Sequence, residues 1–169
     1  ATPSAAEALV ALFVSGRWTA HRAQLPASAA FACEAAAVTF AWFDVHSREA
    51  HRTRCDAAGC TAQHYPVPDA EDNPVLLPLG ANVLLAESPL GGRGVRVRVA
   101  PIERLSDASD FTVVEDSGHH GVGVARLAYG YVRSGAAVLL VTDGSTPRST
   151  YAVRVDGPES FSAVQPGGR

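Results

Sequence analysis

The sequence predicts an all-β protein assembled from repeated units of short strands. One pattern occurs three times: an apolar run that ends at or beside an acidic residue, a turn, an arginine-bearing strand, a second turn and a short strand. Proline and glycine are concentrated between these segments, as short-strand architectures require. Equivalent positions in successive units are 42, 51 and 50 residues apart: Trp18, Cys60, Phe111 and Phe161. A period of this length containing only strands is typical of β-propeller blades.

The strands of the three units can be placed from this pattern. They are expected at 38–44, 49–54 and 60–65; at 83–87, 94–99 and 111–114; and at 137–143, 149–155 and 161–164. Two further strands, at 74–79 and 127–132, bring the units to four strands each. The apolar runs do not alternate with polar residues, so both of their faces should be buried between neighbouring sheets. The strand that follows each run does alternate, as in Val95-Arg-Val-Arg-Val99.

The first residues of the chain admit two interpretations. Ser4 and Glu7 imitate a capping box, which would start a short helix ended by Gly16. Alternatively, a strand ending at Val14 turns at Ser15-Gly16 into a second strand over 18–24. We favour the strand because it supplies a fragment of a fourth unit and because Ser-Gly suits a hairpin turn.

We therefore expect one domain, a β-propeller-like array of about three and a half four-stranded antiparallel blades. The partial blade covers 8–26, and the full blades cover about 29–68, 74–116 and 124–165. The chain has no methionine, even at position 1, so we also expect it to be a processed product or a piece of a longer protein. The ring would then be completed by further blades of the parent chain or by self-association. An open sector of the ring would leave apolar sheet faces uncovered at both ends, such as those carrying Phe13 or Trp18 and Val153 or Val155.

This arrangement resembles β-propellers with sialidase-like (BNR) or kelch-like repeats. The stretch nearest to the sialidase-like Asp-box, Ser-x-Asp-x-Gly-x-Thr-Trp, runs from Val141 through Asp143 to Tyr151 with a different spacing. The resemblance covers nearly the whole chain through its period and strand pattern. It implies a propeller fold and, for the sialidase-like enzymes, arginines from different blades that clamp a substrate carboxylate.

Composition limits the classes of partner. The net charge of −3 gives no general attraction for nucleic acid or for an anionic membrane. No apolar run approaches the roughly 18 residues needed to span a bilayer. All 14 basic residues are arginine, which indicates a GC-rich, bacterial coding sequence. The expected partners are therefore proteins or glycans, without nucleic acid and without a membrane span.

Three cysteines bear on the cellular compartment. Cys55 and Cys60 flank a predicted hairpin turn, where they either form a disulfide or remain two half-buried thiols. A disulfide would indicate an oxidising, extracytoplasmic location, periplasmic or secreted. The pair lacks a second pair of ligands at the spacing of a zinc site. Cys33 is expected to be a small buried residue.

Acidic residues recur where the apolar runs end. Asp44 and Asp143 occupy matching positions, with Glu87 or Ser88 at the corresponding place in the middle unit. Strand ends near a propeller axis line a funnel, where such carboxylates could bind a cation, a sugar or a basic group. The alternative is that an acidic residue simply ends a buried strand at a solvated turn.

Arginines recur in the alternating strands, at Arg54, Arg98 and Arg154. A guanidinium binds a carboxylate through two parallel hydrogen bonds, which suits an anion clamp. The alternative places these side chains in solvent, with their stems covering apolar surface.

The loop around His119 and His120 is the remaining candidate. Adjacent histidines between glycines are weak metal ligands, because neighbouring positions of an extended segment point in opposite directions. A solvated turn between blades is the alternative, and no metal or cofactor is expected. A nucleophile elbow and a phosphate-binding loop are both absent from the sequence.

These observations lead to two functional hypotheses. The preferred one is a non-catalytic propeller module that binds or scaffolds a protein or glycan through its blade loops or rim. The other is a segment of a glycosidase- or sialidase-like propeller, with acidic residues and arginines in a central funnel. Convergence of Asp44, Asp143, Arg54 and Arg154 in one pocket would favour the enzyme, and dispersal would favour the binding module.

Overall fold

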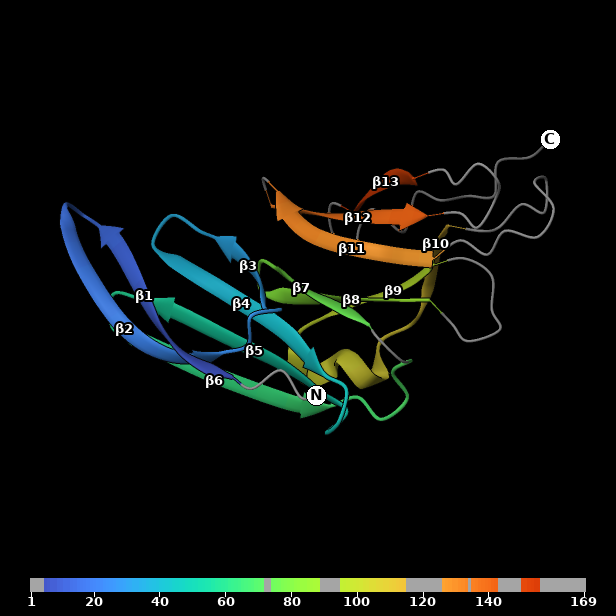
Figure 1. Cartoon of the computed structure of the whole chain (residues 1–169), viewed down its shortest axis with the longest axis horizontal. Helices are drawn as coiled ribbons and strands as arrows, with labels where there is room; N and C mark the ends of the chain where they lie inside the picture. Colours follow the sequence, from blue (N-terminus) through green and yellow to red (C-terminus); the bar gives the residue numbers. More distant parts are fainter. Residues whose placement is uncertain are drawn as a thin grey trace.

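The computed structural model describes residues 5–71, 74–88, 95–114, 126–133, 135–142 and 150–155. Regular structure in these segments is entirely β apart from one short 3-10 helix, so the all-β class is confirmed. The strands form four separate antiparallel sheets, which follow one another in chain order from blue to orange in Figure 1. We call them sheets A to D.

Each sheet is built from consecutive strands. Sheet A contains β1 (Ala6–Val14) and β2 (Arg17–Leu25). Sheet B contains β3 (Ala30–Cys33), β4 (Ala37–Asp44), β5 (Glu49–Asp56) and β6 (Gly59–Pro66). Sheet C contains β7 (Val75–Leu79), β8 (Asn82–Glu87), β9 (Val95–Ala100) and β10 (Phe111–Val114). Sheet D contains β11 (Arg126–Arg133), β12 (Ala136–Thr142) and β13 (Thr150–Val155).

The sheets pack face to face, with an apolar cluster between each neighbouring pair. Val10 and Cys55 belong to the cluster between sheets A and B. Leu85 belongs to the cluster between sheets B and C, whereas its neighbour Leu84 lies with Leu139 between sheets C and D. Successive residues of β8 therefore enter two different cores, which explains why this apolar run does not alternate. Burial on both faces is thus confirmed for 83–86.

The beginning of the chain is a hairpin, so the strand interpretation is confirmed and the helix interpretation is wrong. Its two turn residues have positive φ, 52° at Ser15 and 77° at Gly16. Two such residues form the type of tight turn whose twist matches that of two antiparallel strands. The hairpin register is continuous from Ala6–Leu25 to Val14–Arg17.

Two elements were not expected from the sequence. One is β3, and the other is the 3-10 helix η1 (Ile102–Asp107) that follows Pro101. Ile102 and Leu105 are three residues apart and share one face of this helix, where both are buried between sheets B and C.

The four-strand expectation is met in sheets B and C, and the added strands at 74–79 and 127–132 are confirmed as β7 and β11. Sheet D has three strands within the described segments, and the expected strand at 161–164 lies outside them. Closure of the stack into a propeller stays a prediction.

Candidate functional site

The strongest electrostatic feature is a buried ion pair at the interface of sheets B and C. Arg98 on β9 is 3% exposed and Glu87 at the end of β8 is 1% exposed. Arg98 Nη2 donates to Glu87 Oε2 at 3.1 Å, and Nη1 donates to Asp69 Oδ2 at 2.9 Å. Its Nε lies 3.2 Å from Asp110 Oδ1, as a contact between charges without hydrogen-bond geometry.

A second arginine extends this arrangement. Arg96 contacts Glu71 Oε1 at 3.3 Å and Asp110 Oδ2 at 3.0 Å, while the Glu71 N–H donates to Glu87 Oε1 at 2.8 Å. We call the six residues the Arg98 cluster: Asp69, Glu71, Glu87, Arg96, Arg98 and Asp110. Burial alone lowers the pKa of Arg98, but hydrogen bonds and charge from Glu87 and Asp69 outweigh burial and raise it.

The Arg98 cluster is a network of ion pairs with a structural role. Its two guanidinium groups face four carboxylates, so it offers no vacant cation to an incoming anion. Asp69 and Glu71 come from the segment that leads from sheet B to sheet C. The cluster therefore fixes this connection to sheet C, and each buried charge has the partner that burial requires.

Asp44 and Arg54 lie toward opposite ends of the β4–β5 pair. Asp44 is opposite Glu49, whereas Arg54 is opposite Thr39, five positions away along β4. This offset corresponds to roughly 16 Å of strand. The His46 N–H donates to Asp44 Oδ1 at 2.9 Å and lowers the pKa of Asp44. Arg54 instead contacts Asp56 at 2.8 Å and Glu34 at 3.4 Å.

Arg154 is exposed on β13 of sheet D. Asp143, His119 and His120 lie outside the described residues. Of the described candidates from the sequence, Glu87 and Arg98 are brought into contact. Arg98 is buried, so the solvent-facing alternative is wrong for this arginine.

Sequence reasoning missed a row of stacked rings across sheet B. Trp42, His51 and His64 are directly opposite one another on β4, β5 and β6. The ring centroids of Trp42 and His51 are 5.0 Å apart, and those of His51 and His64 are 5.5 Å apart, with nearly parallel planes. Glu49 contacts both imidazoles, at 3.6 Å for His51 and 3.4 Å for His64. The sequence could have revealed this row if the strand register had been worked out from the two hairpin turns, between β4 and β5 and between β5 and β6.

Burial lowers the pKa of His51, although the charge of Glu49 opposes this effect. The imidazole of His51 is therefore held in its neutral, stacked form over a wider pH range than a free histidine. Among the residues that the structure describes, no set of three or more His, Cys, Asp or Glu side chains is placed so that it could hold a metal ion.

Two of the three cysteines are bonded to each other and the third is free. Cys55 and Cys60 form a disulfide between β5 and β6, so this alternative is confirmed. Cys33 is free and exposed, and its expected burial is wrong. The reason is that β3 is an edge strand of sheet B whose side chains alternate between half-buried and exposed, and Cys33 is at an exposed position.

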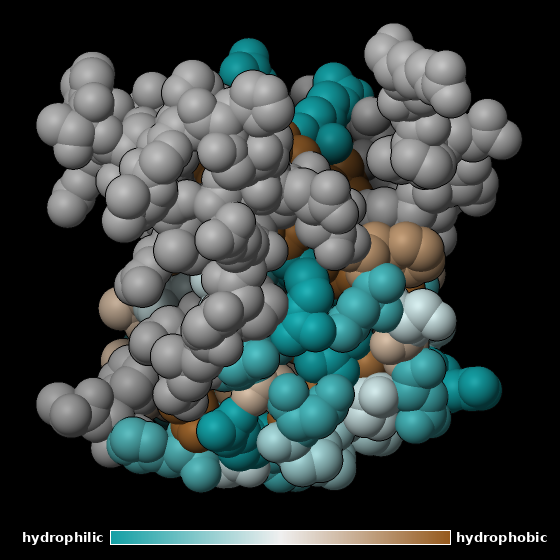
Figure 2. Space-filling view, turned by 90° about the vertical axis from the view of Figure 1, so that its right-hand side faces the viewer, coloured by the Kyte–Doolittle hydropathy of each residue, from teal (hydrophilic) through white to brown (hydrophobic). Residues whose placement is uncertain are grey.

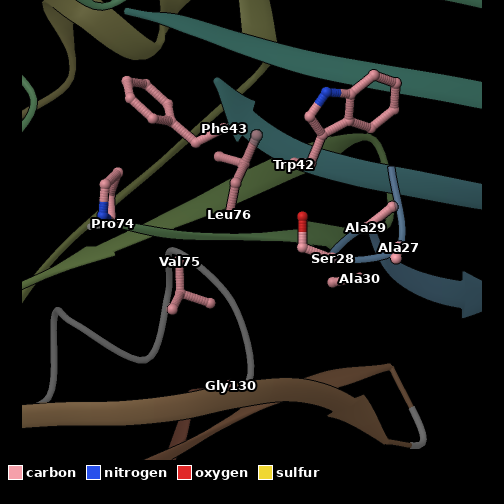
Figure 3. A pocket seen from close by; sticks show the side chains of 10 residues that line it. All are labelled: Ala27, Ser28, Ala29, Ala30, Trp42, Phe43, Pro74, Val75, Leu76 and Gly130. Atoms are coloured by element: carbon pink, nitrogen blue, oxygen red, sulfur yellow. The ribbon is translucent and has the colours of Figure 1, made fainter. Parts of the chain in front are cut away.

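A cavity of about 320 Å³ lies where sheets B, C and D meet (Figure 3). Trp42, Phe43 and Leu76 line it from β4 and β7, and Gly130 of β11 lies across from Val75. None of its ten lining residues is titratable. The cavity therefore offers apolar surface and no group for acid–base chemistry.

Among the described residues, three of the four large apolar side chains that are more than half exposed lie on the outer face of sheet A, and the fourth is Phe31 of sheet B. Leu9, Phe13 and Trp18 are 71%, 59% and 73% exposed. Phe13 is opposite Trp18 in the register, and their ring centroids are 5.2 Å apart. The hairpin face, as we call it, comprises Leu9, Phe13 and Trp18. It presents on the order of 400 Å² of apolar surface, given 150–250 Å² for each aromatic side chain.

The opposite end of the molecule has a different character. Where its residues are described, the surface seen in Figure 2 is mostly hydrophilic, with smaller apolar areas between polar ones. Of the described aromatic side chains that are more than half exposed, Phe13 and Trp18 lie on sheet A, which is at one end of the stack in Figure 1, and Phe31 lies on sheet B.

No helix in the described part of the chain is both long and apolar enough to cross a bilayer. Comparison of the chain with protein-family models, with curated proteins and with solved structures finds no match in any of the three.

Proposed function

We propose that this chain is a non-catalytic binding module whose hairpin face contacts a protein partner. The observation that carries this proposal is the position of Phe13 and Trp18, which lie bare and side by side at the end of the sheet stack. Apolar patches of this kind mark interaction sites when they are contiguous. Exposed tryptophan is also among the residues that contribute most to binding at interfaces.

The distribution of the charged residues supports a binding role over catalysis. A glycosidase needs two carboxyl groups within about 10 Å of one another across a sugar. The four carboxylates of the Arg98 cluster lie close together, but each is paired with Arg96 or Arg98. Asp44 is on sheet B at a turn, away from this cluster. No observation on the described residues favours the sialidase-like alternative.

The partner we propose is a protein rather than a glycan. Sugar sites combine an aromatic ring with several hydrogen-bonding side chains that are available to the ligand. On the outer face of sheet A, Leu9, Phe13 and Trp18 are apolar, and the charged residues Arg22 and Glu7 are paired with each other at 3.0 Å. We further propose that sheets A to D are propeller blades, and that the protein acts outside the cytoplasm. The disulfide between Cys55 and Cys60 supports the second point.

The proposal can be tested with Trp18→Ser and a matched control, Phe111→Ser, which changes an exposed aromatic residue on sheet C. We expect the wild-type protein to bind targets on a protein array and to hydrolyse no chromogenic glycoside. W18S should weaken the selected interaction at least tenfold, and F111S should leave it within twofold. Turnover of a glycoside, binding confined to a glycan array, or equal effects of the two variants would contradict the proposal.

A further inference from the structure

We propose that the free edge of β1 accepts an additional strand from a partner polypeptide, extending sheet A. This inference rests on the proposed binding function and names how the partner is held. Sheet A has two strands, whereas the sheets B and C beside it have four. Three further observations, on the backbone of β1, on the other sheet edges and on the surface beneath, support it.

The first observation is the direction of the backbone groups of β1. In an antiparallel hairpin with a two-residue turn, the pair next to the turn is hydrogen-bonded and alternate pairs follow it. That pair is Val14 with Arg17. The N–H and C=O groups of Phe13, Ala11 and Leu9 therefore point away from β2. Because none of the described strands pairs with the other side of β1, these groups form an open ladder.

The second observation is that β1 lacks the features that protect other sheet edges. Natural edges are shortened, bulged or charged, or they contain proline. β1 has nine residues in unbroken register, and its only charge is Glu7 near its start. The other edge strands of the described sheets all carry such features: Arg17, His21 and Arg22 in β2, four residues in β3, Pro66 in β6, Pro78 in β7, register shifts in β10 and β11, and Arg154 in β13.

The third observation is the surface beneath the open edge. β2 lies against β6, and Val10 of β1 is buried in the cluster between sheets A and B. The strand β1 therefore lies over the interior of sheet B, with its free edge directed toward β4 and β3 (Figure 1). Phe31 of β3 is 59% exposed there, and it contacts the half-buried ring of Phe40. A strand added to β1 would cover both rings.

A second copy of this chain does not fit the site. Antiparallel pairing of two β1 strands would keep both inner faces on the same side, so the two copies of sheet B would occupy the same space. Parallel pairing about a two-fold axis along the strands would place each residue level with itself. The outward N–H and C=O groups of the two strands would then lie at the same levels along the strand axis. A parallel ladder requires them to be offset, so that each N–H faces a C=O.

The occupant we propose is an extended segment of a different polypeptide. Protection of the Leu9, Ala11 and Phe13 amides before any peptide is added would overturn this choice, because another segment of the same chain would then hold the edge. The occupant's side chains facing sheet B must be apolar to cover Phe31 and Phe40. Those on the other side continue the hairpin face beside Leu9 and Phe13, so they should be apolar or uncharged. Backbone hydrogen bonds supply the affinity in this mode of recognition, and alternate side chains supply the specificity.

The test uses two proline variants of the intact chain, Ala11→Pro and Ala20→Pro. Ala11 and Ala20 are opposite each other in the hairpin, and both are exposed. Proline removes the N–H of the β1 edge in A11P and the N–H of the β2 edge in A20P, while edge positions tolerate proline. The probe is a capped nonapeptide of alternating threonine and valine with a lysine at each end. Its control peptide has proline at the central position.

We expect A11P to weaken binding of the alternating peptide at least tenfold and A20P to change it less than twofold. In the wild-type protein, hydrogen exchange at the amides of Leu9, Ala11 and Phe13 should slow at least tenfold when the peptide binds. This second measurement does not depend on the folding of a variant. The control peptide should give neither effect.

Equal effects of A11P and A20P, absence of peptide binding, or protection at Trp18 and Ala20 instead would overturn the inference. A dimer of the protein alone that A11P abolishes would also overturn it, because the occupant would then be a second copy. If W18S abolishes partner binding while A11P leaves peptide binding unchanged, the binding module stands and strand addition fails.

Discussion

Arg98 shows how one residue can depend on a charge network that is distant in sequence. Its carboxylate partners Glu87 and Asp69 are 11 and 29 residues away along the chain. The alternation of valine and arginine in β9 predicts the strand but also suggests that the arginine faces solvent. The sequence pattern alone does not indicate that Arg98 is buried. This can be recognised only once the segment between sheets B and C has been placed, because that segment supplies the ion-pair partner Asp69.

We expect Arg98→Ala to lower the free energy of unfolding by about 3–5 kcal/mol, because it leaves the Glu87 carboxylate buried without a partner. The matched control is Arg54→Ala, whose half-exposed ion pairs should contribute less than about 1 kcal/mol. Urea unfolding measures both. The double variant E87Q/R98M should recover most of the loss, and a mild effect of R98A equal to that of R54A would show that the pair is not buried in solution.

The neutral stacking of His51 gives a pH dependence. Its folded-state pKa is below the ordinary 6.5 because of burial, so the unfolded chain binds a proton more readily near that pH. Stability should therefore be fully present above pH 6.5 and should fall as the pH drops through the folded pKa of His51. In Trp18→Phe, Trp42 is the one remaining tryptophan of the two in the chain. Its fluorescence should titrate with a midpoint below 6.5, and H51N should remove the transition.

At the scale of elements, the hairpin turn of sheet A contains a residue under backbone strain. Ser15 has a φ of 52°, where residues with a side chain other than asparagine or aspartate are disfavoured. We expect Ser15→Asn to raise the free energy of unfolding by a few tenths of a kcal/mol or more, and Ser15→Val to lower it by about 1–2 kcal/mol. Thermal unfolding checks the order of the three proteins. A variant S15V as stable as S15N would mean that the turn adopts another conformation.

The sequence predicted the elements whose residues are locally distinctive. β8 and β12 are uninterrupted apolar runs, and the turn at Ser15-Gly16 has suitable residues for a hairpin. β3 and η1 were missed for different reasons. The four residues Ala30–Cys33 are too few to show a period, and η1 takes its conformation from burial of Ile102 and Leu105 in a core formed by two sheets.

The candidate site was less accessible to sequence reasoning than the fold. Repetition directed attention to Glu87 and Arg98 separately, whereas their contact depends on the β8–β9 register and on Asp69. The hairpin face was indicated more directly, since Phe13 and Trp18 were expected on an uncovered sheet end. The matching expectation for Val155 is wrong, because this residue is buried between sheets C and D.

At the scale of the whole molecule, the stack of sheets ends in an apolar surface that is exposed to solvent. The hairpin face offers about half of the roughly 800 Å² per partner that a stable interface buries. We therefore expect the isolated chain to self-associate weakly, in a concentration-dependent manner, through contact between hairpin faces. Sedimentation equilibrium should detect this at high micromolar concentration, and W18S should remain monomeric. A wild-type chain that is also monomeric there would contradict this expectation.

The exposed sulfur of Cys33 has a practical consequence for such measurements. Because Cys55 and Cys60 are joined, the chain of three cysteines carries a single reactive thiol. It lies on β3 with Phe31, on the same side of sheet B. Air oxidation can link two molecules covalently through this atom and imitate non-covalent association. The same thiol, alkylated with an environment-sensitive dye, would act as a built-in reporter for anything that comes to lie against β3.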